Sequence, residues 1–121
     1  MERPSWRELT YKIKNAVELV SIRKIKILDP IVIASDAIEL DYHVKDLQST
    51  LLAILDEIGP ENYEGTRPPQ KSYKVEIRDA ELFAFSWPSK LFGCKTYVKY
   101  CFKNDCFYLV SLHRDRKEKG D

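Results

Sequence analysis

The spacing of hydrophobic residues changes once along this chain, from a helical period to an alternating one. In the first half, apolar side chains recur every three or four residues, which is typical of helices that bury one face. This spacing predicts helices over residues 6–21, 30–40 and 44–58. Residues 22–28 alternate imperfectly, so they fit either a short edge strand or an extended connection.

The residues at the ends of these segments are those that helix termini favour. Ser5, followed three residues later by Glu8, fits a capping box in which the Ser5 side chain accepts from the Glu8 amide. Asp29 directly precedes a proline, as expected for an N-cap before the first helical residue. Gly59, also followed by proline, predicts a stop in the left-handed conformation.

The second half of the chain favours strands. Residues 59–72 are rich in glycine and proline and predict a loop, after which apolar and polar residues alternate. Strands are predicted over residues 73–78, 82–87, 95–103 and 106–113, followed by a charged tail over 114–121. Helices followed by an antiparallel meander predict one α+β domain over residues 1–121, with the helices packed on one face of the sheet.

Composition narrows the functional classes. A chain of 121 residues with 44% hydrophobic side chains can bury one core. No apolar run approaches the roughly 20 residues of a membrane span, and residues 1–4 lack the apolar stretch of a secretory signal. Cys94, Cys101 and Cys106 show no CxxC spacing, and the chain has two histidines, so we expect free thiols, no metal and no cofactor in a cytoplasmic protein.

The near-neutral net charge of +1 hides a strong segregation of charge. Residues 29–64 carry nine acidic side chains and one lysine, whereas residues 90–121 carry eight basic and four acidic ones. An acidic helical side and a basic sheet side would attract a polyanion at one place. The same distribution also fits ordinary solvated helices and strand edges protected by lysine.

The register of the last hairpin decides which side chains share the open face of the sheet. Alternation places Tyr97, Lys99 and Lys103 on one face of their strand and the core residues on the other. A two-residue turn at 104–105 with a regular ladder pairs Tyr97 with Leu112 and directs His113 toward the helices. An odd connection or a bulge pairs Tyr97 with His113 on the open face, and the sequence leaves both registers open.

In the second register the open face has the groups that metal-free RNA cleavage needs. Tyr97 and His113 can exchange protons, and Lys99 can stabilise charge on phosphorus. Arg114 is a further candidate catalytic residue, which would bind and stabilise the scissile phosphate with Lys99, and Arg116 would position the RNA. The alternative reading is an amphipathic strand with a surface histidine at its end.

Residues outside the hairpin supply further candidate substrate ligands. Arg67, in the loop over residues 63–69, can clamp a phosphate, although a plain connection is the alternative. Lys103, on the open face of its strand, extends the same basic surface.

Four segments resemble the MqsR branch of the RelE-like mRNA interferase toxins: residues 36–41, the loop beginning at 62–63, residues 93–99 and residues 109–114. The resemblance extends in order and length over residues 9–116 and is specific in the last two strands. It implies a RelE-like fold and a bacterial toxin that cleaves mRNA without a metal. It also implies a cognate antitoxin as partner, with the ribosome as a further candidate.

The resemblance assigns roles to individual positions. Tyr97 matches the catalytic tyrosine of the family, and His113 lies where the family has a lysine near its C-terminus. Glu64 replaces another lysine of the family. The family's strand glutamine has no counterpart here, since Ala84 or Phe85 occupies that position. Arg67 or Lys71 is our hypothetical substitute for the missing lysine.

Two functions of other classes compete with the nuclease. The basic sheet face fits a module that binds nucleic acid or protein without cutting. The acidic helices fit an interaction domain for a basic protein.

Overall fold

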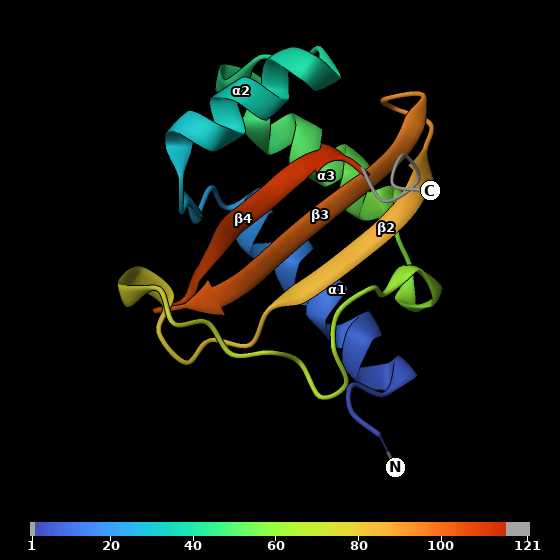
Figure 1. The fold of residues 1–121 in the computed structure, drawn as a ribbon, viewed down its shortest axis with the longest axis vertical. Coiled ribbons are helices and arrows are strands. Elements are labelled where there is room, and N and C mark those ends of the chain that lie inside the picture. The colour runs from blue at the N-terminus through green and yellow to red at the C-terminus, as the bar shows by residue number, and fades with distance from the viewer. Residues whose placement is uncertain (1, 116–121) are drawn as a thin grey trace.

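The computed structural model of the chain describes residues 2–115 and has two layers, with helices covering one face of a four-stranded sheet (Figure 1). This arrangement confirms the predicted α+β class. The helices and strands, in chain order, are α1 (Trp6–Ser21), β1 (Ile25–Ile27), α2 (Pro30–Leu40), α3 (Leu47–Glu57), β2 (Phe83–Ser89), β3 (Cys94–Lys103) and β4 (Cys106–Arg114). Short 3-10 turns occupy Val44–Asp46, Pro60–Asn62 and Val75–Ile77.

The predicted helix starts are confirmed in their local chemistry. The Ser5 hydroxyl accepts from the amide of Glu8 at 3.0 Å, and the Asp29 carboxylate accepts from the amide of Val32 at 3.4 Å. These bonds satisfy amides that have no partner inside the helix. The third predicted helix, 44–58, begins instead with the turn Val44–Asp46 and is α-helical only from Leu47.

The helix stops differ from the prediction at one position. Gly59 has φ −139°, which is extended backbone, so the predicted left-handed stop after α3 is wrong. Left-handed residues follow the other two helices instead, at Arg23 after α1, where φ is 63°, and at Asp41 after α2, where φ is 64°. Aspartate tolerates this conformation better than most residues that carry a Cβ.

The sheet has the strand order β1-β4-β3-β2 and is mixed. The meander β2-β3-β4 is antiparallel as predicted, whereas β1 pairs in parallel with β4, with Ile25 opposite Phe107. The segment 22–28 therefore supplies an edge strand, which settles the alternative that the sequence left open. The crossover between these parallel strands spans most of the chain.

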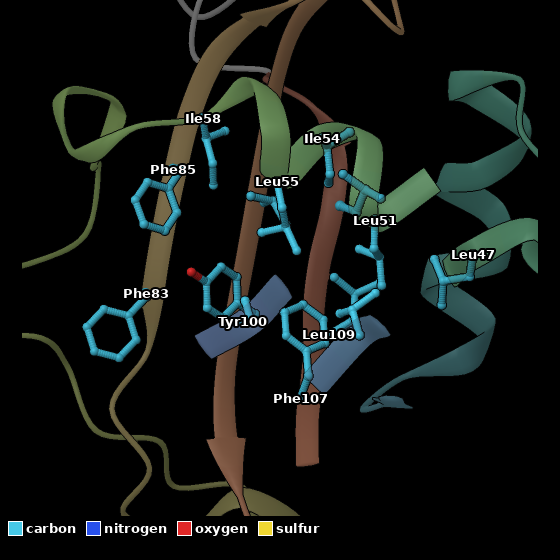
Figure 2. Packing of buried hydrophobic residues seen from close by; sticks show 14 of the residues in the cluster. Leu47, Leu51, Ile54, Leu55, Ile58, Phe83, Phe85, Tyr100, Phe107 and Leu109 are labelled. Carbon is cyan, nitrogen blue, oxygen red and sulfur yellow. The ribbon is translucent and has the colours of Figure 1, made fainter. Parts of the chain in front are cut away.

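One continuous core joins the helix layer to the sheet. Figure 2 shows Leu51, Ile54 and Leu55 of α3 facing aromatic residues of the sheet, among them Phe85 and Tyr100, all with at most 2% exposure. The Tyr100 hydroxyl donates to the carbonyl of Lys12 in α1 at 3.2 Å, so even the polar tip of this ring is satisfied. Burial of each large apolar side chain stabilises the fold by about 1.5–3 kcal/mol.

The strand predicted over residues 73–78 is wrong. Val75–Ile77 forms a 3-10 turn, and the chain around it closes on itself through two backbone bonds of 3.0 Å between Ser72 and the pair Asp79 and Ala80. Tyr73 is 88% exposed and Val75 77% exposed, so the alternation of this segment does not reflect a buried face. Within residues 73–78, Ile77 alone is buried.

This closed loop covers part of the sheet face opposite the helices. Ile77, Ala80 and Cys101 form a second, small hydrophobic cluster, with Val110 packed against it. Cys101 alternates with Lys99 and Lys103 on this face of β3, and the loop buries it fully. The part of this face outside the cluster includes Tyr97 and His113, at the end of the sheet away from the β3–β4 turn.

Candidate active site

A β-bulge in β4 brings Tyr97 and His113 together. From the β3–β4 turn as far as Tyr100, which lies opposite Leu109, the ladder is regular. The register then shifts by one residue, so that Lys99 lies opposite Ser111 and Tyr97 opposite His113. The rings of Tyr97 and His113 stack with their centroids 5.1 Å apart and an interplanar angle of 20°. The hairpin has both the two-residue turn at 104–105 and a bulge, and it is the bulge that places His113 opposite Tyr97.

The spacing of two leucines in β4 indicates the bulge, although regular alternation of the strand does not. Leu109 and Leu112 are both fully buried on the helix face, although an odd spacing of three residues separates them. A strand can direct both side chains to one face only if it carries an extra residue between them. Val110 is that residue, because it is skipped between the partners of Tyr100 and Lys99.

The His113 ring is held in one tautomer by its own strand. Its Nδ1 lies 2.8 Å from the carbonyl oxygen of Arg114. A carbonyl oxygen can only accept, so Nδ1 carries the proton and neutral His113 keeps its lone pair at Nε2. This arrangement makes Nε2 the proton acceptor of the pair.

Lys99 lies on the same face, two residues from Tyr97 along β3. Its cross-strand neighbours are Ala84 of β2 and Ser111 of β4, both small. Tyr97 and Lys99 line a hollow of about 120 Å³ together with Glu64 and Gln70. An ammonium group next to a phenol and an imidazole can stabilise negative charge that develops between them.

A buried carboxylate lies beyond the stacked pair at the same end of the sheet. Ser86 lies opposite Tyr97 in the ladder, and its hydroxyl donates to the carboxylate of Asp115. Asp115 is only 7% exposed, and its amide donates to the carbonyl of Lys95 at 2.9 Å. These bonds fix the backbone that follows His113. Neither Ser86 nor Asp115 was identified from the sequence as a site residue.

Several predicted ligands do not lie with the pair. Arg114 follows His113 directly, so strand alternation directs it to the opposite face. Arg67 donates to the carbonyl of Pro4 at 2.7 Å and covers the ring of Tyr63, 5.1 Å from its centroid. The ammonium of Lys103 donates to the carbonyl of Arg78 at 2.9 Å, near the far end of the hairpin. Arg116 lies outside the described residues.

Lys71 lines a second hollow, of about 290 Å³, which includes Lys99 but neither residue of the pair and which we call the lysine hollow. Lys99, Gln70 and Leu82 line this hollow as well as the smaller one, so the two are contiguous. Gln70 and Lys74, which also lines the lysine hollow, were not identified from the sequence, because both lie in a loop whose position depends on tertiary contacts.

The three cysteines are free thiols, as expected, with Cys101 buried and Cys94 and Cys106 half-buried. Within residues 2–115, no helix has the length and apolar character that a membrane crossing requires.

Comparisons with known proteins add no family assignment. No protein-family model matches the chain, and no curated protein sequence matches it. The resemblance to the MqsR branch therefore stays a prediction that depends on the residues given above.

Proposed function

We propose that this protein is an endoribonuclease that cleaves mRNA with side-chain acid–base chemistry and without a metal. The observation that carries the proposal is the stacked pair of Tyr97 and His113 on the sheet face opposite the helices. Lys99 on the same face supports it, since a cation next to two proton carriers suits a phosphodiester.

The proposed reaction is an internal transfer at phosphorus. Nε2 of His113 accepts the proton of a ribose 2′-hydroxyl as its oxygen forms a bond to phosphorus. The Tyr97 hydroxyl gives its proton to the leaving 5′-oxygen as the P–O5′ bond breaks. The products are a 2′,3′-cyclic phosphate and a 5′-hydroxyl, and proton exchange with water restores both side chains. Lys99 stabilises the additional negative charge on the phosphoryl oxygens.

The distribution of charge supports an anionic substrate at this face. The acidic side chains of α2 and α3 belong to the layer on the other side of the sheet, whereas Lys71, Lys74 and Lys99 line the lysine hollow. Glu64 lines the adjoining smaller hollow, but the three lysines outnumber it and would attract a polyanion to this part of the sheet face. Arg114 and Arg67 have no direct part in this scheme. Arg114 lies on the opposite face of the strand from His113, and Arg67 donates to the carbonyl of Pro4.

The test uses a short oligoribonucleotide and its fully 2′-deoxy counterpart. The wild type should cleave the first in excess chelator, leave the second intact and yield a cyclic phosphate end. Tyr97→Phe and His113→Gln should each slow cleavage by about 10²-fold or more, which is the usual size of one proton-transfer contribution. Tyr108→Phe is the matched control, because Tyr108 lies opposite Cys101 in the same hairpin, about 13 Å along the strand from Tyr97.

Cleavage at the wild-type rate by both variants would refute the assignment, as would cleavage of the deoxy strand. The wider proposal is a cytoplasmic toxin that is silenced by a cognate antitoxin protein, with the ribosome as a candidate partner. Induction in a bacterial host should then arrest growth, and His113→Gln should relieve the arrest.

The second candidate function is binding without cleavage. The observation that favours it is the stacking itself, because aromatic rings beside lysine also form a platform for single-stranded bases. RNA affinity that falls steeply with salt, with no cleavage under any condition tested, would favour this function.

A further inference from the structure

The lysine hollow combines an apolar floor with a cationic rim. Leu28, Leu82 and Val110 supply the apolar side chains, and residues 70–74 form one wall. Val110 is the extra residue of the bulge, so the same residue that sets the register of Tyr97 and His113 also lines the hollow. Its volume of about 290 Å³ is just below the range for small-molecule sites, roughly 300–1,000 Å³.

Among residues 2–115, the charged side chains that line the hollow all have one sign. They are Lys71, Lys74 and Lys99, and no acidic side chain of this range is among the lining residues. Tyr73, in the same wall, is 88% exposed, which is unusual for a large aromatic ring. Exposed aromatic rings beside lysines are typical of sites where a base stacks while its phosphate meets a cation.

The wall is held in place before any ligand arrives. Ser72 is buried and exchanges backbone bonds of 3.0 Å with Ala80 and Asp79, and Ile77 is buried beneath the loop. Lys103 also bonds the carbonyl of Arg78 at 2.9 Å. A preformed wall reduces the entropy that a ligand must lose on binding.

We propose that the lysine hollow holds the base and phosphate of one nucleotide, the neighbour of the phosphodiester at Tyr97 and His113. The inference rests on the proposed function for its link to cleavage. Lys99 makes that link, because it lines both the lysine hollow and the smaller hollow that contains Tyr97. The base lies on the apolar floor beside Tyr73, and the phosphate meets Lys71 and Lys74.

Binding is measured by fluorescence anisotropy with a labelled oligoribonucleotide that carries 2′-O-methyl groups and resists transfer at phosphorus. Tyr73→Ala should weaken binding by about tenfold, from the loss of one stacked base. It should leave the salt dependence unchanged, because no phosphate contact is lost. Tyr11→Ala, at a tyrosine of α1 that is 59% exposed and lies outside the hollow, is the matched control.

The double variant Lys71→Ala/Lys74→Ala should behave differently. It should lower the slope of log affinity against log salt by about 0.7, the contribution of one single-strand phosphate, because both lysines contact the same phosphate. Lys45→Ala, at an exposed lysine of the turn Val44–Asp46, should leave the slope unchanged. Adenosine monophosphate should compete with the oligonucleotide better than inorganic phosphate does.

The outcomes separate the two proposals. If the wild type cleaves RNA but Tyr73→Ala and the double lysine variant bind it with unchanged affinity, the proposed nucleotide site is wrong and the proposed nuclease still stands. Equal competition by inorganic phosphate would also overturn it, because it would show an anion site without a base. If both variants reduce the affinity for the oligonucleotide and the wild type cleaves no RNA, the results would support nucleotide binding in the hollow and refute the nuclease.

Discussion

Glu57 connects the end of α3 to the β2–β3 hairpin, and its replacement by glutamine should destabilise the fold. One carboxylate oxygen accepts from the indole of Trp87 at 2.7 Å and from the hydroxyl of Ser89 at 2.8 Å. The other accepts from the amide of Leu91 at 2.9 Å. Burial favours the neutral acid, but these hydrogen bonds outweigh it and hold the pKa of Glu57 below its usual value.

The magnitude follows from the three bonds. In Glu57→Gln the remaining oxygen can still accept from Trp87 and Ser89, but the new amide group faces the N–H of Leu91, and two donors cannot bond. A hydrogen bond to a charged group contributes about 1.5–3 kcal/mol, and one to a neutral group about 1 kcal/mol. We expect the free energy of unfolding to fall by about 2 kcal/mol.

The assay is urea unfolding at a series of pH values. Because the folded pKa of Glu57 is lowered, its stabilising effect is complete above the unfolded value, about 4.3, and disappears as the pH falls through the folded pKa. The wild type should therefore exceed Glu57→Gln in stability at pH 7 and converge with it in acid. Asp56→Asn, at the exposed neighbour, should change the free energy by at most about 0.5 kcal/mol. Equal midpoints at pH 7, or a difference that is independent of pH, would refute the reasoning.

Three further perturbations test other parts of the structure. Tyr42→Phe should leave the free energy of unfolding unchanged or raise it by up to about 1 kcal/mol, because the buried Tyr42 hydroxyl has no hydrogen-bond partner within residues 2–115; a clear loss in urea unfolding would contradict this. Deletion of Val110 should keep the fold and the contact between the rings of Tyr97 and His113, because Ser111 then follows Leu109 as the regular partner of Lys99; loss of cross-peaks between the rings in NMR spectra would contradict it. Burial raises the pKa of the Cys101 thiol to about 11, so iodoacetamide at pH 8 should label Cys94 and Cys106 first and reach Cys101 only in urea, as mass spectrometry of the labelled peptides can show.

The chain order of helices and strands was readable from the sequence because it depends on local patterns. Ser5 and Asp29 cap helices through their own neighbours in the chain, and the strands that became β2, β3 and β4 alternate because one face is buried along their length. The three main helices and the antiparallel meander follow from these local features. The prediction for residues 73–78 was wrong because Tyr73 and Val75, two of its alternating apolar residues, are exposed. The alternation of this segment therefore does not mark a buried face.

The site depended on contacts between distant parts of the chain. The residues of the pair were named from the sequence, but their meeting required the bulge at Val110, which forms because Leu109 and Leu112 must both reach the helix layer. Likewise Gln70, Lys71 and Lys74 lie near Lys99 only because Ile77 anchors their loop onto the sheet. Alternation records which side chains point together within a strand, whereas the burial of distant partners determines which strands, loops and registers bring them to one place.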